Sequence, residues 1–316
     1  MEQKRCYLAV DGGNSKTEYR LLGANGAMIA ARRGGGSNHE VLPGGFASAA
    51  DVVVGEIEDL LAAHGYALTE VADAVLGLAG ADYDEEAAAL EQALTARGLS
   101  NCFVCNDGYL GVMAGFESGT GICYSAGSGV TCAGINAEGK RVQFGGIGVL
   151  SGDIGGGFDI AQFVYRSIYE HIFFGKAYTT LKDAVFTLLD IKSTDEFRSA
   201  PGRVLTEEVA RQLVGLFFTA METNDVLALQ YAAQAASHAA DCIIAAADAL
   251  SLKPPVQVAL SGSIMTAASP PAYRRMIEYE LYRRKGKNFI LRINDLPPVE
   301  GAVRWVRLRN RLSAVP

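Results

Sequence analysis

An acidic residue and a hydroxyl-rich glycine turn follow the first apolar segment of the chain, residues 6–10. The turn consists of Asp11, Gly12, Gly13, Asn14, Ser15, Lys16 and Thr17. Glycine lets a backbone approach an anion closely, and successive N–H groups and hydroxyls can donate hydrogen bonds to phosphoryl oxygens. A carboxylate here can hold Mg²⁺ through water, because that cation keeps part of its hydration shell. These residues predict a phosphate-binding hairpin with Asp11 as the metal-linked acid, and an ordinary hairpin turn is the alternative.

A second acid follows another apolar segment, residues 101–105. Asn106, Asp107 and Gly108 separate this expected strand from an expected helix over 109–116. The carboxyl end of a buried strand faces the crevice where ligands collect in α/β sheets. An Asp at that place can take the proton from a hydroxyl as a general base. The alternative interpretation of Asp107 is a helix cap, because Asp is favoured at the N-cap.

Two further glycine-rich segments lie in the middle of the chain. Gly127, Ser128 and Gly129 follow an expected strand over 120–126 and could form a second phosphate-binding turn. Residues 145–157 hold seven glycines, which cannot form a stable helix or strand interior. We expect this segment to be a ligand-facing loop, with Asp153 as a candidate acid for a sugar or a metal. A flexible linker is the alternative.

The remaining polar candidates are weaker as isolated signals. Ser37, Asn38 and His39 combine a hydroxyl, an amide and an imidazole, which suits a sugar because its hydroxyls need both donors and acceptors. Many surface loops contain the same residues. Ser261 and Gly262 follow an expected strand, and Gly301 opens an expected final helix, so a nucleotide could lie against either segment.

Composition sets the broad class of the protein. A chain of 316 residues is long enough for two domains with cores of their own. The net charge of −7 argues against a nucleic-acid-binding protein, for which a basic patch is expected. The first residues resemble no signal peptide, and no apolar run reaches the roughly 20 residues of a membrane span. We therefore expect a cytoplasmic protein with no membrane segment and with reduced thiols.

The order of expected elements indicates two related halves. Each half opens with a strand, a glycine turn and two more strands, and helices follow. We expect an α/β fold made of two duplicated ribonuclease-H-like domains, as in the superfamily of sugar kinases, actin and ATP-driven chaperones, with a nucleotide cleft between them. The expected domains are residues 1–117 and 118–316. The second would carry a helical insertion, and the final helix could pack back on the first domain.

In order along the chain, these motifs resemble the N-acetylglucosamine kinase branch of the BadF/BadG/BcrA/BcrD ATPase family. The resemblance covers nearly the whole chain and is carried by residues 11–17, 37–39, 106–107, 126–129, 145–148, 152–155, 260–262 and 298–302. It implies an ATP-dependent kinase that uses Mg²⁺ and transfers the γ-phosphoryl group to the 6-hydroxyl of an amino sugar, such as N-acetylglucosamine or glucosamine. A homodimer is expected as well.

The resemblance also implies a role for each motif. Asp107 resembles the base that deprotonates the sugar hydroxyl, and Asp11 resembles the Mg²⁺-linked acid. The two phosphate loops would be formed by Gly12, Gly13, Asn14, Ser15, Lys16 and Thr17 and by Gly127, Ser128 and Gly129. The adenosine would be bordered by Ser261, Gly262 and Gly301. The sugar pocket would be formed by Ser37, Asn38, His39, Asn106, Gly145, Gly146 and Asp153.

The chain departs from the family pattern at several positions. Val130 stands where the second phosphate loop usually has a hydroxyl, and Ile147 replaces a tryptophan in the Gly-Gly-Trp-Gly loop. Ile154 stands in place of a glutamate beside Asp153. The identity of the sugar is therefore open. Two alternatives also remain: an ATP-hydrolysing activator of a dehydratase or reductase, with Cys132 near a glycine turn, and a non-catalytic sugar- or nucleotide-binding relative.

Overall fold

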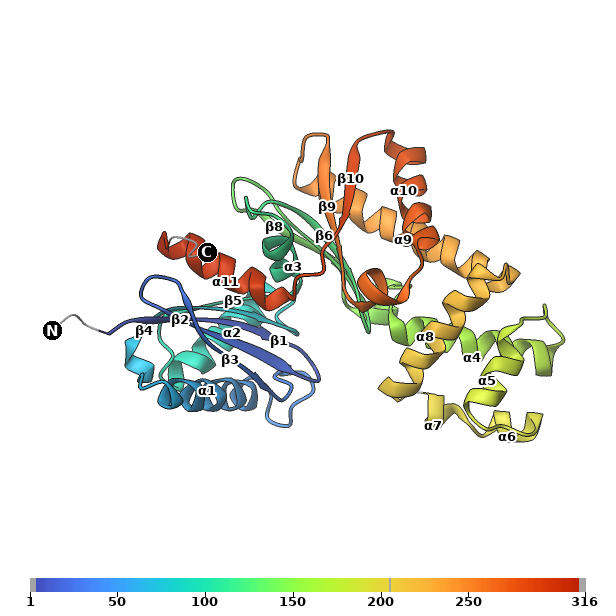
Figure 1. Ribbon diagram of the computed structural model, residues 1–316, viewed down its shortest axis with the longest axis horizontal. Helices are drawn as coiled ribbons and strands as arrows, with labels where there is room; N and C mark the ends of the chain where they lie inside the picture. Colours follow the sequence, from blue (N-terminus) through green and yellow to red (C-terminus); the bar gives the residue numbers. More distant parts are fainter. Residues whose placement is uncertain (1–3, 205, 313–316) are drawn as a thin grey trace. The chain divides into compact units, whose positions relative to one another are not determined.

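The computed structural model describes residues 4–204 and 206–312 of the chain (Figure 1). The residues before Lys4, which the sequence places ahead of the first strand, lie outside this range. The chain forms two compact units. The first unit comprises Met1–Cys123, Ala133–Arg141 and Leu296–Pro316, and the second comprises Tyr124–Cys132 and Val142–Asp295. The C-terminal segment therefore belongs to the same unit as the N-terminal strands.

The first unit is built on a five-stranded mixed sheet. Its strand order is β3-β2-β1-β4-β5. β1 pairs with β2 in antiparallel fashion, whereas β1, β4 and β5 are parallel to one another. The strands are β1 (Cys6–Gly12), β2 (Thr17–Gly23), β3 (Met28–Gly34), β4 (Val71–Leu78) and β5 (Cys102–Cys105). Because β1, β4 and β5 are parallel, their carboxyl ends meet at one edge of the sheet.

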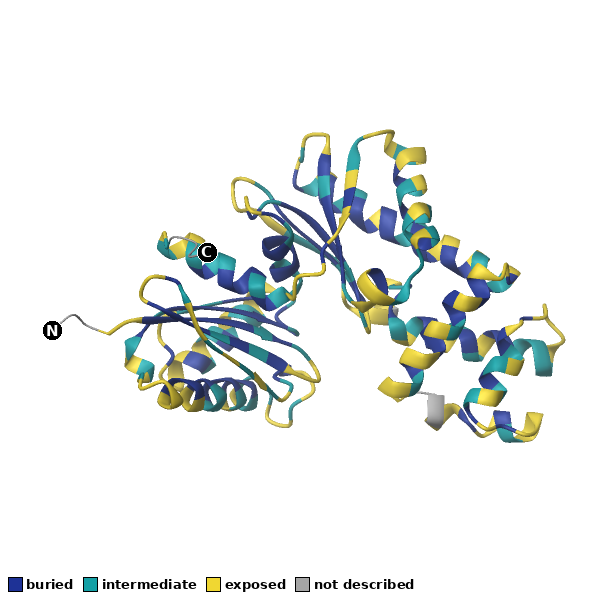
Figure 2. Ribbon diagram, viewed as in Figure 1, coloured by how far each residue is buried: buried dark blue, intermediate teal, exposed yellow. Residues whose placement is uncertain are grey.

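Helices cover both faces of this sheet, and the sequence of β1 shows why. Leu8 and Val10 pack with α1 (Gly45–Ala63) and α2 (Asp84–Ala96), while Ala9 packs with α3 (Gly108–Gly115) and α11 (Pro298–Asn310). Successive side chains of a strand point to opposite faces, so an uninterrupted apolar strand needs cover on both. Figure 2 shows β1 and β4 buried along almost their whole length.

The second sheet has the order β10-β9-β6-β7-β8. Its strands are β6 (Gly121–Ala126), β7 (Val130–Ile135), β8 (Arg141–Gly145), β9 (Val256–Ser261) and β10 (Phe289–Ile293). The helices of the second unit are α4 (Gly157–Phe174), α5 (Leu181–Leu188), α6 (Thr194–Arg198), α7 (Pro201–Val204), α8 (Glu207–Glu222), α9 (Val226–Ala249) and α10 (Pro271–Lys285). Three shorter helical turns occur at η1 (Leu68–Glu70), η2 (Gly148–Ser151) and η3 (Ile264–Ala268).

The two cysteines of β5 lie on opposite faces of the first sheet. Cys102 packs on the α1–α2 face of β5 and Cys105 on the α3–α11 face, as the alternation of a strand requires. A shared metal ion is therefore excluded for this pair. All six cysteines of the chain carry thiols rather than disulfide bonds.

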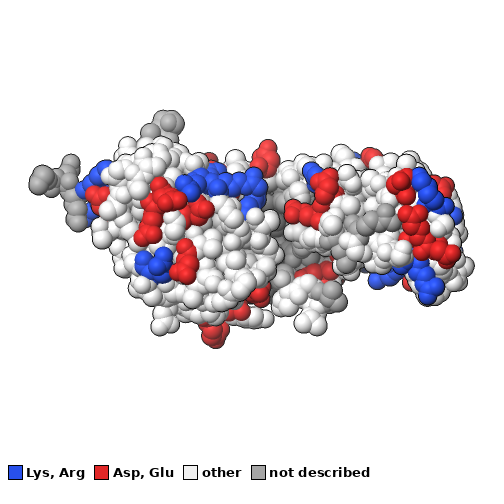
Figure 3. All heavy atoms as spheres, turned by 90° about the horizontal axis from the view of Figure 1, so that it is seen from below, with Lys and Arg blue, Asp and Glu red and all other residues white. Residues whose placement is uncertain are grey.

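The surface carries charges of both signs. On the face drawn in Figure 3, Lys and Arg side chains lie among Asp and Glu side chains. Across residues 4–204 and 206–312, no helix combines the length and the apolar content that crossing a membrane requires.

Asp225 fixes the start of the longest helix. Its side chain accepts hydrogen bonds from the N–H of Ala228 at 3.0 Å and from the N–H of Thr180 at 2.7 Å. Burial raises the pKa of Asp225, but these bonds outweigh it and the net pKa lies below the ordinary value. One carboxylate thus caps α9 and holds the segment before α5.

We predict that Asp225→Ala lowers the free energy of unfolding by about 1–3 kcal/mol at pH 7, because the N–H groups of Ala228 and Thr180 lose their acceptor. Urea unfolding measures this loss. Since the folded pKa is depressed, the stabilisation is present above the unfolded pKa near 3.8 and disappears as the pH falls through the folded pKa. Asp225→Asn is the control, which keeps an N-cap acceptor. Equal losses for Ala and Asn would contradict this role.

Candidate functional site

Two carboxylates lie at the edge where the parallel strands of the first unit end. Asp11 is the penultimate residue of β1, and Asp107 follows β5 by two positions. Burial, followed by the charge of Asp107, raises the pKa of Asp11 to about 7. Burial, followed by the charge of Asp82, raises the pKa of Asp107 to about 6. These acids are held together at an electrostatic cost, which is a common property of functional sites.

The start of α3 bears on the helix-cap interpretation of Asp107. Asp107 occupies the N-cap position of α3, yet its side chain makes no capping hydrogen bond. Asn106 satisfies the local backbone instead, because its Oδ1 accepts from the N–H of Gly108 at 2.7 Å. The Nδ2 of Asn106 donates to Asp82 at 2.7 Å. Asn106 therefore fixes both Asp82 and the start of the helix that carries Asp107.

The first glycine turn packs against the segment after β3. The N–H of Gly13 donates to the carbonyl of Lys16 at 2.9 Å, and the N–H of Ser37 donates to the carbonyl of Gly13 at 3.0 Å. A Cβ on Gly12 would overlap the Ser37 hydroxyl. Asn14 and Lys16 are exposed, as is Ser15 between them. The exposed tip of the turn is thus available to a phosphate, while its base is closed by protein contacts.

Two predicted ligand-binding hydroxyls are used inside the protein. Thr17 is fully buried, and its hydroxyl lies 2.8 Å from the carbonyl of Gly35 and 2.9 Å from the Oγ of Ser37. Ser37 is 1% exposed. A hydroxyl has only one proton to donate, and that of Thr17 has acceptors within the unit. Both residues therefore stabilise the turn, and neither presents its side chain to solvent.

Asn38 and His39 lie beside this turn. The Nδ2 of Asn38 donates to the side chain of Asn14 at 2.7 Å, so Asn38 connects the turn to the segment after β3. The His39 ring stacks on Phe46 with a centroid distance of 4.1 Å. Its Nδ1 is buried and has no hydrogen-bond partner. Asn38 is therefore placed near the acidic edge of the sheet, and His39 chiefly packs on α1.

A polar cavity of about 260 Å³ adjoins Asn106. Its lining includes Asp82, Tyr109 and Arg141. The Arg141 guanidinium lies 5.5 Å from the centre of the Tyr109 ring. Sequence reasoning missed these three residues. Asp82 follows the end of β4 as Asp107 follows β5, so the rule that selected Asp107 could have found it, whereas Arg141 comes from a distant segment and carries no such signal.

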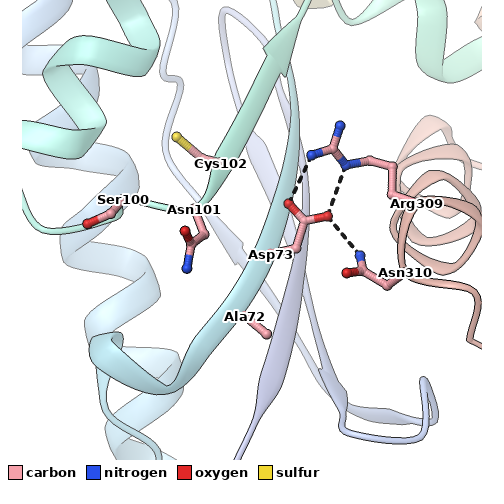
Figure 4. A pocket seen from close by; sticks show the side chains of 7 residues that line it. All are labelled: Ala72, Asp73, Ser100, Asn101, Cys102, Arg309 and Asn310. Carbon is pink, nitrogen blue, oxygen red and sulfur yellow. Dashed lines mark hydrogen bonds and ion pairs between the residues drawn. The ribbon is translucent and has the colours of Figure 1, made fainter.

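A second polar cavity of the first unit lies at the opposite, amino-terminal end of β4 and β5 (Figure 4). Both carboxylate oxygens of its central residue, Asp73, are occupied. Arg309 donates to them at 2.9 and 3.3 Å, and Asn310 donates at 2.7 Å. Asp73 therefore fastens α11 to β4, and its paired carboxylate is not poised for chemistry.

In the second unit, the turn over Gly127, Ser128 and Gly129 packs against the start of α4. The N–H of Gly157 donates to the carbonyl of Gly127 at 2.8 Å, and the N–H of Phe158 donates to the carbonyl of Ser128 at 3.1 Å. A Cβ on Gly156 would lie 2.7 Å from the Cα of Gly129, so glycine is required there. The carbonyls of Gly127 and Ser128 thus face α4, while the carbonyl of Gly129 accepts from the N–H of Gly127 within the turn at 2.9 Å.

A cavity of about 380 Å³ adjoins this turn. Its walls are formed by Gly127, Ser128, Gly157, Phe158, Glu207, Ala210, Arg211, Val214, Ser263, Ile264, Ala267 and Ala268. Most of these residues are apolar or small, which suits a flat aromatic group. The helical walls from α8 and η3 were not foreseen from the sequence, because the helix positions that line them carry no motif.

Asp153 organises the glycine-rich loop. Its Oδ2 accepts hydrogen bonds from the N–H groups of Gly146 and Gly148, both at 2.8 Å. A Cβ on Gly145 would lie 2.8 Å from Oδ1, so that glycine permits the carboxylate to enter the loop. The loop is thus an ordered structure around one carboxylate rather than a flexible linker. It exposes Ile147 at its surface.

Three predicted nucleotide contacts are places of close packing. Ser261 is buried at the end of β9, and a Cβ on Gly262 would overlap the carbonyl of Ala126 at the end of β6. A Cβ on Gly301 would overlap the carbonyl of Leu110, where α11 crosses α3. Gly262 and Gly301 therefore allow backbones to approach, each within its own unit.

The predicted residues fall into two groups. Within the first unit, the structure brings Asp11, Asn14, Asn38, Asn106 and Asp107 to the carboxyl edge of the sheet, and it places Gly301 on the helical face instead. Within the second unit, the glycine turn, the glycine loop with Asp153, and Ser261 lie at or beyond strand ends.

Comparison with known proteins places this site in a family. The model of the BadF/BadG/BcrA/BcrD ATPase family matches residues 8–306. The chain belongs to this family. Over 194 residues it is 27% identical to an N-acetylmuramic acid/N-acetylglucosamine kinase of Clostridium acetobutylicum, covering 60% of this chain and 61% of that protein. Over 173 residues it is 25% identical to an N-acetyl-D-glucosamine kinase of Dictyostelium discoideum, covering 52% and 54%. The alignments thus span less than two thirds of these relatives.

Solved structures confirm the fold class of this BadF/BadG/BcrA/BcrD ATPase family member. A protein from Chromobacterium violaceum, described as a candidate N-acetylglucosamine kinase, superposes with a TM-score of 0.70 at 23% identity, over 95% of this chain and 98% of that one. The predicted α/β fold with two actin-like ATPase domains is therefore confirmed. The identity is low enough that this likeness describes the fold alone.

The close crossing of α11 over α3, the helix that follows Asp107, can be tested by substitution of Gly301. We predict that Gly301→Ala lowers the free energy of unfolding by about 1–3 kcal/mol, because the new methyl group meets the backbone of α3. Gly55→Ala is the matched control on α1, where a Cβ meets open space and a gain of about 0.5–1 kcal/mol is expected. Urea unfolding compares the two variants. Equal shifts would show that the crossing tolerates a side chain.

Proposed function

We propose that this protein is an ATP-dependent kinase that transfers the γ-phosphoryl group to the 6-hydroxyl of an amino sugar, such as N-acetylglucosamine or glucosamine. The observation that carries the proposal is the carboxylate pair Asp11 and Asp107 at the carboxyl edge of the first sheet, next to a glycine turn with an exposed polar tip. Family membership and the activities named for the two curated relatives support it.

Asp107 is the proposed general base. Its pKa of about 6 leaves it mostly ionised at neutral pH while keeping it a stronger base than an ordinary Asp. Asp107 would accept the proton of the sugar hydroxyl as the hydroxyl oxygen forms its bond to the γ-phosphorus and the bond from that phosphorus to the β,γ-bridging oxygen breaks. ADP leaves with the bridging oxygen. Positioning and charge neutralisation supply most of the catalysis in such transfers.

The nucleotide is proposed to use the two glycine turns and the cavity of about 380 Å³ that adjoins the second turn. Asn14, Ser15 and Lys16 have the exposure needed to meet phosphoryl oxygens, and Ser128 lies on the wall of the 380 Å³ cavity. The apolar lining of that cavity suits the adenine base. Gly12, Gly13, Gly127 and Gly129 give the turns their shape, while Thr17, Gly262 and Gly301 act through packing.

The residues around Asp11 fit a magnesium ion. Asp11 is half-buried beside two other acids, Asp107 and Glu18, and the charges of Lys16 and Arg20 only partly offset them. Mg²⁺ is commonly held by one or two carboxylates together with water and phosphate, so a single acid is sufficient. We propose that Asp11 would hold the ion, which would supply charge neutralisation at the phosphates.

The sugar is proposed to contact Asn38, Asn106 and Asp107, and the loop that Asp153 organises. The N–H groups of Gly146 and Gly148 are directed at Asp153, so Gly145 and Gly146 would meet a sugar through their other backbone atoms. Ser37 and His39 would support Asn38 from behind, because both are buried.

The two compact units support the proposal that the chain folds as two domains, with the C-terminal helix packed on the first. A cytoplasmic location and a homodimer stay predictions. The activator alternative has no matching observation, because Cys132 is fully buried in β7 and cannot reach an iron–sulfur cluster at a surface.

The proposal is tested by coupled ADP release with Mg·ATP and a panel of sugars: N-acetylglucosamine, glucosamine, N-acetylmannosamine, N-acetylmuramic acid and glucose. Release that depends on one sugar, with mass spectrometry of the product showing one added phosphate, is the expected result. Product NMR then assigns the phosphorylated hydroxyl. Sugar-independent ADP release, or none with any member of the panel, would count against the proposal.

Replacing the base should separate chemistry from stability. We predict that Asp107→Asn lowers kcat by about 100-fold or more while ATP still binds. Folding raises the pKa of Asp107 from 3.8 to about 6, so the folded state favours the protonated acid. The contribution of Asp107 to the free energy of unfolding is therefore fully present below pH 3.8 and is lost as the pH rises through 6. The Asn variant should therefore be more stable than the wild type at pH 8, by on the order of 1 kcal/mol. Unchanged turnover would remove Asp107 from the mechanism.

The neighbouring acid should tune the pH profile. Asp82 is the largest cause after burial that raises the pKa of Asp107, so Asp82→Asn should move the acidic limb of the kcat/KM profile to lower pH. Asp84→Asn is the control, since Asp84 lines the same cavity but is not one of the charges that raise the pKa of Asp107. An acidic limb that stays in place in Asp82→Asn would show that another group controls it.

A further inference from the structure

A buried carboxylate oxygen lies beneath the glycine loop of the second unit. Oδ2 of Asp153 is satisfied by two backbone N–H groups, but Oδ1 is buried and has no hydrogen-bond partner. A buried polar atom without a partner costs about 1–3 kcal/mol, and more when it carries charge. Native proteins rarely leave such an atom uncompensated. Oδ1 therefore points to a donor that completes the site.

His238 of α9 is the group placed to donate. Its Nε2 lies 3.8 Å from Oδ1 of Asp153, which is longer than a hydrogen bond but close enough to become one after a small shift of the loop. The His238 side chain is 19% exposed, and that of Asp153 is 6% exposed. The contact is thus largely shielded from water. A hydrogen bond to a charged acceptor has a greater effect in such a shielded place than in water.

Several other titratable groups lie around Asp153, but the 3.8 Å contact with Oδ1 is made by His238. Cys242 follows His238 by one helical turn, and its Sγ lies 3.6 Å from the same Nε2. Burial, followed by the charge of Asp153, raises the pKa of the Cys242 thiol to about 11, so the thiol stays neutral. The titratable groups that face this cluster from the surrounding elements are Tyr124 of β6, Cys132 of β7, Asp241 of α9 and Tyr273 of α10. Asp241 pairs with Arg284 on the outer side.

We propose that His238 is a positioning residue that donates its Nε2–H to Oδ1 of Asp153 and thereby fixes the loop over residues 145–148. The effect reaches the loop through two bonds, because Asp153 holds the N–H groups of Gly146 and Gly148 with its other oxygen. His238 itself touches no part of the loop in this scheme. The consequence for sugar affinity rests on the proposed function, whereas the effect on loop order does not.

The first test uses the protein without any substrate. Hydrogen exchange of the amides of Gly146 and Gly148, followed by NMR or by mass spectrometry of the peptide over 145–152, should be about tenfold faster or more in His238→Ala than in the wild type. His238→Gln keeps an N–H donor at a similar distance from the backbone and should restore most of the protection. Gln234→Ala, an exposed position one turn earlier on α9, is the matched control and should exchange like the wild type.

The second test is kinetic and depends on the kinase activity. In His238→Ala, we expect KM for the sugar to rise by about tenfold, while kcat and KM for ATP change by less than about twofold. His238→Gln should again restore the wild-type value. Because the exchange experiment needs no sugar, loss of the kinase proposal would leave the positioning role testable.

Two results would overturn the inference. Unchanged exchange of the loop amides in His238→Ala would show that Asp153 holds the loop without help. Equal behaviour of the Gln and Ala variants would show that the size of the side chain matters rather than its N–H group. Faster exchange with an unchanged KM for the sugar would remove the link to binding, and thermal unfolding of each variant checks that the fold is retained.

Discussion

The crowding of half-buried carboxylates at the carboxyl edge of the first sheet is the constraint on which the account depends. Parallel pairing of β1, β4 and β5 brings the carboxyl ends of these strands to one edge, and three residues at or after those ends are acidic: Asp11, Asp82 and Asp107. Burial and mutual repulsion raise the pKa of Asp107 and still more that of Asp11. Such an arrangement destabilises the fold locally, and it supplies both a base and a place for a cation.

Polar contacts hold this edge in place. Asn106 bonds Asp82 and the first turn of α3, while the glycine at position 301 lets α11 press against the middle of the same helix. The second unit uses a related device, because the Asp153 carboxylate lies inside the glycine loop and binds its N–H groups. In both units, close backbone approach at glycine and a buried side-chain acceptor together set the geometry.

Much of the architecture could be predicted from local sequence. The strand expected over 120–126 differs from β6 by one residue at its start, and the helix expected over 109–116 is shifted by one residue from α3. Alternation along a strand is enough to place Cys102 and Cys105 on opposite faces of the sheet, where the structure has them. Residue type alone could not show that the Thr17 hydroxyl hydrogen-bonds with Gly35 and Ser37, because these contacts form only when β2 and β3 pair. His238 was missed for the same reason, since it meets Asp153 only through the packing of α9.

Titration of the carboxyl carbons of Asp11 and Asp107 by ¹³C NMR in the protein without ligands tests the central claim most directly. Single Asp→Asn variants assign the two signals. The account predicts apparent pKa values near 7 for Asp11 and near 6 for Asp107, with Asp107→Asn lowering the pKa of Asp11 and Mg²⁺ lowering it further. Two independent titrations near pH 4, unaffected by each other or by Mg²⁺, would contradict it.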